Sequence, residues 1–277
     1  MSTPAARMPL VSIRGLTVTY EGGEAAHKGR PLPALTETDL DIAAGERLAV
    51  IGESGSGKST LALAIAGLLP ASATIEGKIE WPGLRRGPAH GRDIGFVFQD
   101  PAASLDPVLT IGEQVAEVAR THLGLGWKEA YARAADLLGR VRLPDPRRAL
   151  AAYPHQLSGG QKQRVCIAAA IAAGPKLLIA DEATSALDTI VQAEIVTLLR
   201  RLTEEDGMTL LFISHDIALA AGLADRIAVF RHGRAVEIGP AAQVIEAPRH
   251  AYTRALLDAH IGLDAAPLVA RTAGTAR

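Results

Sequence analysis

The chain has 277 residues, of which 48% are hydrophobic and 21% are charged, and its formal net charge is −1. This composition supports a packed core and excludes disorder as the default state, while the near-neutral charge predicts no general affinity for nucleic acid or anionic lipid. The single cysteine, Cys166, excludes an internal disulfide framework, and we expect it to be a buried thiol. We expect no membrane span, because Pro70 and Lys176 interrupt the best apolar runs, and no secretory leader, because Met1 to Pro9 has no apolar core.

The first part of the chain predicts strands on both sides of a loop. Leu10 to Tyr20 alternates apolar and polar residues, which indicates a strand or a strand pair broken at Gly15. Glu21 to Pro33 carries Gly, Lys, Arg and Pro without periodicity and is a predicted surface loop. Leu35 to Ile42 resumes the strand pattern, and the turn at Ala44-Gly45-Glu46 then leads into the next strand.

A phosphate-binding sequence follows the apolar run Leu48 to Ile51. Gly52-Glu53-Ser54-Gly55-Ser56-Gly57-Lys58-Ser59-Thr60 fits the spacing G-x-x-x-x-G-K-[ST] between a strand and a helix. Glycines without Cβ atoms let consecutive backbone N–H groups turn inward as an anion-binding nest, and the helix adds its positive dipole end. Lys58 would then reach the β- and γ-phosphates, and Ser59 would ligate Mg²⁺. The alternative, a flexible Gly/Ser loop, is disfavoured by the strand-then-helix context.

Helices and short buried strands then alternate, as in an α/β domain with a mostly parallel sheet. The predicted helices are Lys58 to Leu69 ending at Pro70, Thr110 to Arg142 with a second segment over Trp127 to Arg140, Ser158 to Ala173, Asp188 to Glu205, Ala241 to Glu246 and Tyr252 to His260. The predicted strands are Ile75 to Trp81, Ile94 to Phe98, Lys176 to Ala180, Thr209 to Ile213, Arg226 to Phe230 and Ala235 to Ile238. The helical run after Gln99 is interpreted as an insertion, and the basic stretch Leu84 to Arg92 as a solvated loop.

Polar residues follow four of the predicted buried strands. These are the phosphate loop after Ile51, Gln99 after Phe98, Asp181-Glu182 after Ala180, and His215 after the strand that ends at Ile213. Because ligands collect at the carboxyl ends of parallel strands, we expect one site. There Asp181 would hold Mg²⁺, mostly through water, and Glu182 would be the general base for the attacking water. Gln99 would sense the metal and water, and His215 would contact the γ-phosphate.

Each of these residues alone has an ordinary structural alternative. A carboxylate can cap a helix, an amide can bond a turn, and an imidazole can be satisfied inside a core. The four strand ends together with a phosphate loop favour hydrolysis instead. We expect the barrier to be lowered by positioning and by compensation of phosphate charge, without covalent catalysis.

Leu157-Ser158-Gly159-Gly160-Gln161 separates this chain from other phosphate-loop enzymes. A serine and two glycines at a helix N-terminus make a second anion site. With the motifs above, the sequence resembles the ATPase subunit of ATP-binding cassette (ABC) transporters over roughly residues 10–260. The resemblance implies an α/β P-loop NTPase cassette over residues 8–260, with a RecA-like core, an antiparallel β subdomain and a helical subdomain at about 100–165, followed by a C-terminal tail over 261–277.

The resemblance also assigns residues to the nucleotide. In the family, the segment matching Ser158, Gly159, Gly160 and Gln161 completes the ATP site of a facing subunit, so these residues would contact ATP in trans. Asp188, in Ser185-Ala186-Leu187-Asp188, matches the loop that communicates across the dimer. Tyr20 stands where an aromatic ring stacks on adenine; the alternative is a strand aromatic packed in the core.

A narrower resemblance lies in Phe98-Gln99-Asp100-Pro101, Ser104-Leu105-Asp106-Pro107, Thr110-Ile111-Gly112 and the tail run Ala251 to Leu257. These runs are similar to the importer branch that handles di- and oligopeptides or nickel. The branch implies ATP and Mg²⁺, a second ABC ATPase subunit that is identical or a paralogue, two integral membrane permease subunits and an extracytoplasmic solute-binding protein. The chain would then lie at the cytoplasmic face of the inner membrane, as a peripheral subunit.

The sequence departs from that branch at two positions. Ala183 and Ala251 stand where the branch usually has proline, and the tail lacks the cysteine cluster of some members, so we expect no iron–sulfur centre. An importer ATPase for peptides or nickel is the favoured function. The alternatives are an ABC ATPase for another substrate, an ABC protein acting on nucleic acid, and a phosphate-loop kinase. The last is disfavoured by the Leu157 to Gln161 motif and by Glu182.

Overall fold

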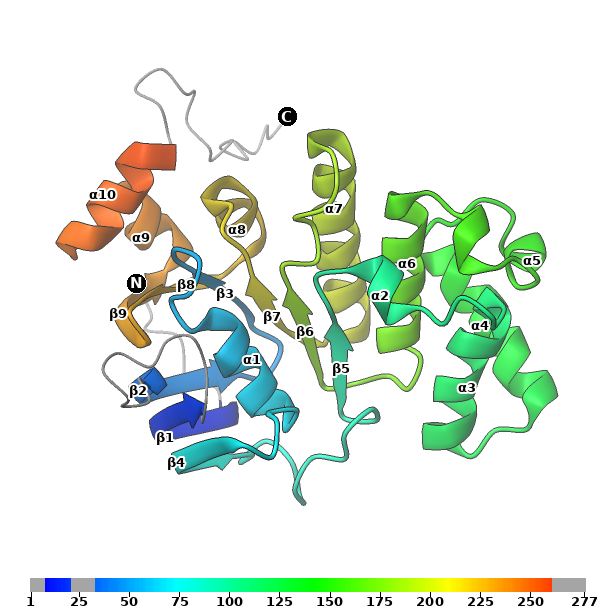
Figure 1. Cartoon of the computed structure of the whole chain (residues 1–277), viewed down its shortest axis with the longest axis horizontal. Helices are drawn as coiled ribbons and strands as arrows, with labels where there is room; N and C mark the ends of the chain where they lie inside the picture. The colour runs from blue at the N-terminus through cyan, green and yellow to red at the C-terminus, as the bar shows by residue number, and fades with distance from the viewer. Residues whose placement is uncertain (1–7, 21–32, 261–277) are drawn as a thin grey trace, which may run out of the picture.

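The computed structural model of the chain describes residues 8–20 and 33–260. They form a six-stranded sheet with helices on both faces, a three-stranded antiparallel sheet, and a lobe of helices beside the larger sheet (Figure 1). The predicted loop Glu21 to Pro33 lies outside the described residues except for Pro33. The predicted tail over 261–277 also lies outside them. This arrangement is the α/β cassette that the sequence predicts, with its antiparallel β part and its helical insertion.

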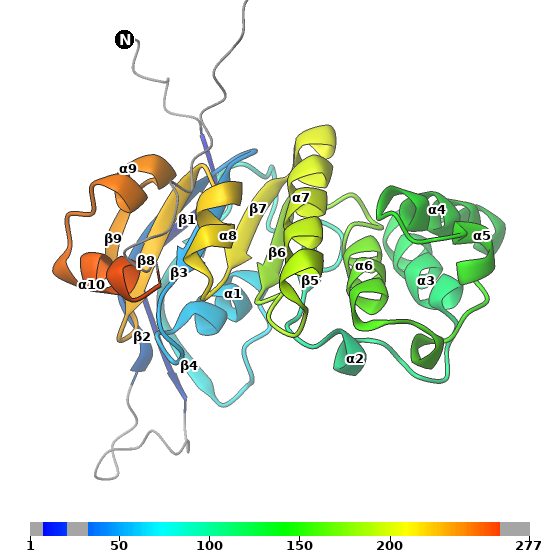
Figure 2. The same cartoon turned by 90° about the horizontal axis from the view of Figure 1, so that it is seen from above.

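The larger sheet has the strand order β5-β6-β7-β3-β8-β9. Its strands are β5 (Ile94–Val97), β6 (Leu177–Asp181), β7 (Thr209–Ile213), β3 (Arg47–Ile51), β8 (Arg226–Arg231) and β9 (Arg234–Pro240). All neighbours pair in parallel except β8 and β9. Alternate residues face different layers: Leu177 and Ile179 pack in the cluster that contains α1 (Lys58–Ala66), while Leu178 packs with α7 (Thr189–Asp206). Both faces are covered, which explains the continuous apolar runs of these strands (Figure 2).

The smaller sheet has the order β2-β1-β4 and supports the helix of the phosphate loop. Its strands are β1 (Pro9–Tyr20), β2 (Pro33–Ala43) and β4 (Ala73–Glu80). Gly15 does not divide β1 into two strands. It sits in a bulge with φ of 57°, where the register against β2 shifts between Ile13 and Leu16. Both of these side chains are buried with the residues of α1 between the two sheets.

The helical lobe lies beyond strand β5 at the edge of the larger sheet (Figure 2). It consists of α2 (Pro101–Ser104), α3 (Ile111–Leu123), α4 (Trp127–Arg140), α5 (Pro146–Ala149), a 3-10 turn (Pro154–Gln156) and α6 (Gly159–Ala170). Cys166 on α6 is buried, and desolvation raises the pKa of its thiol to about 12, as expected for a thiol that acts as a small hydrophobe. Within residues 8–20 and 33–260, no helix combines the length and the apolar character that a membrane crossing needs.

Several helix boundaries differ from the prediction for identifiable reasons. Helix α1 ends at Ala66, before Pro70, because Gly67 adopts a left-handed conformation and its N–H bonds the Ala64 carbonyl. Helix α8 (Ile217–Leu223) was not predicted, since it is short; Asp216 caps its first turn by accepting from the Leu219 N–H. The last two described elements are helices, as expected: α9 (Ala241–Glu246) and α10 (Ala251–His260).

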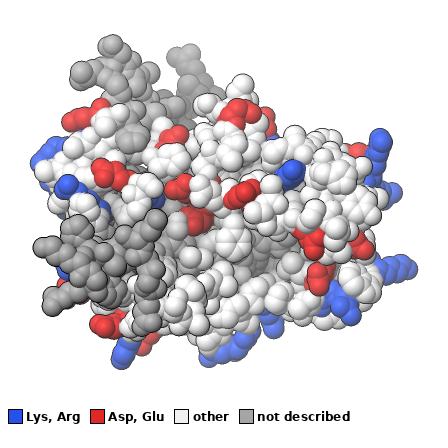
Figure 3. All heavy atoms as spheres, in the orientation of Figure 1, with Lys and Arg blue, Asp and Glu red and all other residues white. Residues whose placement is uncertain are grey.

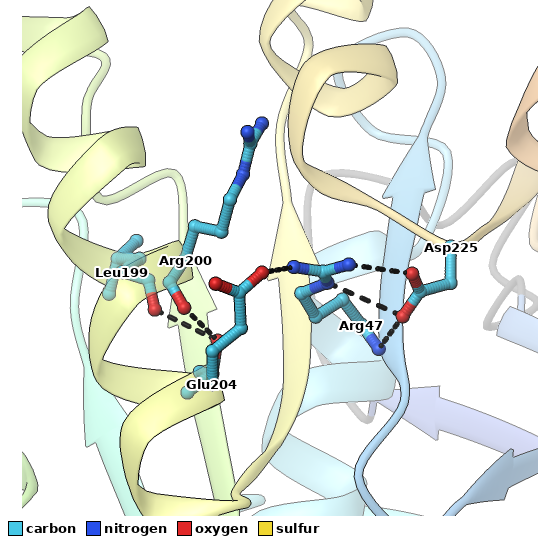
Figure 4. A network of polar contacts seen from close by, with 6 residues as sticks. Arg47, Leu199, Arg200, Glu204 and Asp225 are labelled. Atoms are coloured by element: carbon cyan, nitrogen blue, oxygen red, sulfur yellow. Dashed lines mark hydrogen bonds and ion pairs between the residues drawn. The ribbon is translucent and has the colours of Figure 1, made fainter. Parts of the chain in front are cut away.

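Arg47, the first residue of β3, joins helix α7 to the segment between α8 and β8, at the edge of the sheet opposite the phosphate loop. Its Nη2 lies 2.8 Å from Asp225 Oδ1, its backbone N–H donates to Asp225 Oδ2 at 3.0 Å, and its Nη1 pairs with Glu204 of α7 (Figure 4). The hydrogen bond to Asp225 is the main cause that raises the pKa of Arg47. The side chain is only 22% exposed, so solvent screens these contacts less than at an open surface.

We expect Arg47→Met to lower the free energy of unfolding by about 1–3 kcal/mol, because it removes charge-assisted bonds that tie α7 to the segment after α8. Urea unfolding followed by circular dichroism measures the loss. Arg147→Met, on the exposed surface of α5, is the matched control and should stay within about 0.5 kcal/mol of the native chain. Equal losses for the two variants would contradict a stabilising role for the Arg47 network.

Candidate nucleotide-binding site

The sheet order brings the four predicted strand ends to one edge. Strands β5, β6, β7 and β3 are consecutive neighbours, and their registers align Val97 with Ala180, Asp181 with Ile213, and Val50 with Ile213. The phosphate loop therefore follows β3 on one side of β7, and Asp181-Glu182 ends β6 on the other side. His215 follows the strand between them, and Gln99 follows β5 at the end of the row.

The phosphate loop has a backbone that only glycine fits at two points. Gly52 has φ of 149°, and a Cβ there would lie 2.2 Å from the Phe230 carbonyl oxygen. Gly57 has φ of 98°, and its Cβ would lie 2.5 Å from the Ala34 oxygen. Because Gly57 is also the N-cap of α1 and offers no side-chain cap, the first N–H groups of that helix stay available to a ligand. The loop thus has the shape and the donors of an anion cradle.

Ser56 gives independent support for a polar ligand in this loop. Its Oγ is buried, with the residue only 4% exposed, and it has no hydrogen-bond partner among the described residues. A buried hydroxyl without a partner carries a desolvation cost that a bound polar group would relieve. The remaining loop residues, Glu53, Ser54 and Gly55, are exposed along the outer rim.

Lys58 is buried against the loop that it follows. It is 4% exposed, and its Nζ donates to the carbonyl oxygens of Gly52 and Glu53, each at 2.8 Å. Burial lowers the pKa of Lys58, while the nearby carboxylates of Glu182 and Asp181 act in the opposite direction. A cation is therefore held at the base of the loop, within the electrostatic reach of both acids.

Ser59 and Asp181 meet across the sheet edge, as a shared metal site requires. Ser59 Oγ, in the first turn of α1, donates to Asp181 Oδ1 at 3.0 Å. Burial raises the pKa of Asp181, and the hydrogen bond from Ser59 opposes that rise. Within the described ranges, no group of three or more His, Cys, Asp or Glu residues could hold a metal ion. Two hard oxygen ligands beside a phosphate cradle nevertheless fit Mg²⁺, which takes most of its ligands from phosphate and water.

Glu182 and His215 form the second pair of the site. His215 Nδ1 lies 3.6 Å from Glu182 Oε2, and the two side chains are 57% and 19% exposed. Glu182 has φ of 46°, which is unusual for a residue with a Cβ. Its N–H donates to the Ile213 carbonyl at 3.0 Å, and its own carbonyl accepts from the Ser185 hydroxyl at 3.0 Å. These two bonds therefore hold the strained backbone of Glu182 in place.

Tyr20, Thr60 and Gln99 also border the site, although with fewer contacts. The Tyr20 hydroxyl lies 3.3 Å from Thr60 Oγ1, and the ring packs partly against the core beneath the loop. Gln99 is exposed, two residues after the end of β5. The hydrogen bonds among the described residues do not join Gln99 to Ser59 or Asp181, so its metal role stays a prediction.

The Ser158 segment lies apart from the phosphate loop. Ser158 and Gln161 form a capping box at the start of α6, and a Cβ on Gly160 would lie 2.8 Å from Val191 Cγ1. Helix α6 contacts α2, α3, α4 and β5, whereas α1 contacts β2, β6 and β7. Asp188 caps α7 by accepting from the Val191 N–H at 3.0 Å. Contact of Ser158, Gly159, Gly160, Gln161 or Asp188 with a nucleotide therefore stays a prediction.

One contact of the loop was not predicted from the sequence. The Glu53 N–H donates to the hydroxyl of Tyr252 on α10 at 3.3 Å, across 199 positions of the chain. The C-terminal run containing Tyr252 was recognised only by its resemblance to the importer branch. No spacing in the sequence could have located this contact, because it depends on where α10 lies relative to β8, whose Arg231 guanidinium is 4.7 Å from the centre of the Tyr252 ring.

The chain has extensive similarity to proteins of known family. The family model described as ABC transporter matches residues 35–185. A Brucella melitensis protein, whose name describes it as a peptide import ATP-binding protein, is 42% identical over 268 residues, or 91% of this chain and 77% of that protein. The glutathione import ATP-binding protein GsiA of Salmonella typhimurium is 40% identical over 265 residues, which cover 90% of this chain but 42% of GsiA.

Solved structures agree with this assignment. The dimeric ATP-binding cassette MJ0796, in a post-hydrolysis state with ADP and Pi, superposes with a TM-score of 0.71 and 33% identity over 83% of this chain and 98% of that chain. The cbiO1 protein of Clostridium perfringens, part of the ABC transporter complex cbiONQ, superposes with a TM-score of 0.71 and 28% identity. The match covers 86% of this chain and 91% of that chain. The fold and the phosphate loop define an ATP-hydrolysing cassette. The chain belongs to the ABC transporter family.

Proposed function

We propose that this chain is the ATP-hydrolysing subunit of a peptide importer, which energises uptake through separate membrane permease subunits. The observation that carries the proposal is the 42% identity, over 91% of the chain, to a protein named for peptide import. The geometry supports it, because the side chains expected for ATP hydrolysis lie at one sheet edge around an anion cradle. In this proposal the chain is a peripheral subunit at the cytoplasmic face of the inner membrane.

The hydrolysis chemistry follows from the positions of the side chains. Lys58 and the N–H groups of residues 52–60 compensate phosphate charge, and Glu182 takes the proton of the attacking water. His215, beside Glu182, contacts the γ-phosphate. Ser59 and Asp181 would hold Mg²⁺, and Gln99 would sense it; the bound ion would supply charge compensation at the phosphate oxygens.

The proposed catalytic unit is a dimer of two cassettes, identical or paralogous. Ser158 and Gly159 are exposed at the start of α6, and the Ser158 N–H already donates to Gln161 Oε1 at 2.9 Å. In this proposal the Gly159 N–H and the start of the helix therefore meet a nucleotide on a facing subunit. Asp188, beside this helix start, contributes to the same interface. Tyr20 borders the phosphate loop of its own chain, where its ring stacks on adenine. One chain alone should therefore hydrolyse ATP poorly.

A groove between the sheet and the helical lobe is the proposed seat of the permease. It has a volume of about 380 Å³, and its lining carries no Lys, Arg, Asp or Glu. Leu68 and Phe98 line it and are 46% and 43% exposed. Figure 3 shows charged side chains around the face, with a largely uncharged region near its middle. We propose that a short apolar helix of a permease subunit fills this groove, and that a solute-binding protein delivers the substrate on the other side of the membrane.

Uptake of labelled dipeptide and of labelled nickel tests the proposal in cells that carry the native chain, Glu182→Gln or Leu68→Asp. We expect dipeptide uptake to fall at least about tenfold in both variants, while nickel uptake is unchanged. Purified Leu68→Asp should keep native ATPase activity, because the residue lies in the groove and not at the nucleotide. Ile75→Asp, at an exposed position of β4, is the matched control. Loss of nickel uptake alone would reassign the substrate, and no loss of either would contradict import of peptides.

A further inference from the structure

Tyr252, on helix α10, forms a hydrogen bond with the peptide group between Gly52 and Glu53, the first of the phosphate loop. Its hydroxyl accepts a hydrogen bond from the Glu53 N–H at 3.3 Å, and the carbonyl oxygen of Gly52 accepts from Lys58 Nζ at 2.8 Å. That N–H and that carbonyl belong to the same peptide group, so the group is fixed at both ends. We infer that Tyr252 is a positioning residue for the phosphate loop, through which the C-terminal helix α10 sets the affinity for ATP.

The ring of Tyr252 is itself fixed beside the loop. Tyr252 is 7% exposed, and the Arg231 guanidinium lies 4.7 Å from the centre of its ring. Arg231 follows Phe230, whose carbonyl oxygen excludes any side chain at position 52. Burial raises the pKa of Tyr252, so the hydroxyl is protonated at neutral pH and accepts the N–H bond as a neutral group. Strand β8 therefore positions both partners of the contact.

Helix α10 is anchored firmly enough to act as a support. Glu237 of β9 accepts from the N–H groups of Arg249 and His250, at 2.9 and 3.0 Å, just before the helix begins. Desolvation raises the pKa of Glu237, but the hydrogen bonds that this carboxylate accepts, these two and others from side chains, together keep that pKa below its ordinary value. Leu256 and Leu257, one turn after Tyr252, are buried in the main core. The hydroxyl of Tyr252 therefore has a fixed position relative to the sheet.

The contact matters most when the nucleotide is bound. In the proposed function, Lys58 turns toward the phosphates and no longer holds the Gly52 carbonyl. The bond from Glu53 to Tyr252 then remains as the side-chain contact that orients this peptide group. If that bond is absent, the first turn of the cradle has more freedom to lose on binding, so ATP affinity falls. The inference rests on the phosphate-loop assignment and is independent of the transported substrate.

Tyr252→Phe in the full chain tests this inference, because it removes only the hydroxyl. We expect KM and the calorimetric Kd for ATP to rise together by about 3- to 10-fold, as for one neutral hydrogen bond, with kcat within about twofold. Tyr131→Phe, in helix α4 of the lobe, is the matched control and should have native KM, Kd and kcat. Thermal unfolding distinguishes a purely structural role, which would lower Tm with KM unchanged.

Lys58→Ala separates two possible failures: a wrong role for Tyr252 and a wrong assignment of the phosphate loop. If Lys58→Ala loses ATP binding and Tyr252→Phe keeps native KM and Kd, the role of Tyr252 is overturned and the phosphate loop stands. If Lys58→Ala itself binds ATP normally, the loop assignment on which the inference rests is wrong. A fall in kcat at native KM for Tyr252→Phe would also overturn positioning of the loop for binding.

Discussion

Glu182→Gln should reduce the rate of ATP hydrolysis by about 10²–10⁴-fold, the usual contribution of a general base, while ATP still binds. The amide keeps the size of the side chain but cannot take the proton of the attacking water. Its backbone contacts to Ile213 and Ser185 do not involve the carboxylate, so the position of the residue is retained. The variant should therefore bind ATP and remain trapped in the closed dimer, because it cannot hydrolyse the nucleotide.

Phosphate release at saturating ATP measures this effect, and size-exclusion chromatography with ATP detects the trapped dimer. Glu76→Gln makes the same change at an exposed position of β4 and should behave as the native chain. Rapid hydrolysis by Glu182→Gln would remove the residue from its proposed role. His215, at 3.6 Å from Glu182, would then be the next candidate for the base.

Lys58→Ala should lower kcat/KM for ATP by at least about 10²-fold, because in the proposed site it removes the cation that compensates phosphate charge. The loss has a second physical source in this chain. Before ATP binds, Lys58 Nζ donates to the carbonyl oxygens of Gly52 and Glu53, so its removal leaves the empty loop less ordered, with more freedom to lose on binding. We therefore expect weaker ATP binding as well as slower hydrolysis.

Equilibrium binding of ATP and steady-state hydrolysis, measured on the same preparations, separate these two losses. Lys78→Ala, at an exposed position of β4, controls for the loss of one positive charge. Lys58→Arg should be impaired nearly as much, because the residue is 4% exposed and the larger guanidinium does not fit. Native affinity in Lys58→Ala would show that the phosphates bind elsewhere.

Much of the site could be predicted because its parts are local in the sequence. The phosphate loop occupies nine consecutive positions, and its glycines, lysine and serine act through the backbone turn that they themselves form. Asp181, Glu182 and His215 follow buried strands whose apolar runs are visible without a structure. Helix ends were predicted less well. Pro70 is a strong local signal, yet Gly67 ends α1, since a left-handed glycine can close a helix wherever packing stops it.

The sequence by itself determined the class of chemistry, the strand ends that carry it and the membership of the family. Only the tertiary structure decided which of these ends touch. Strand β7 separates β3 from β6, yet Ser59 and Asp181, 122 positions apart, meet in a hydrogen bond, and Tyr252 supports Glu53 from 199 positions away. The physical reason is that hydrophobic periodicity encodes which residues are buried, whereas strand order and helix docking choose their partners.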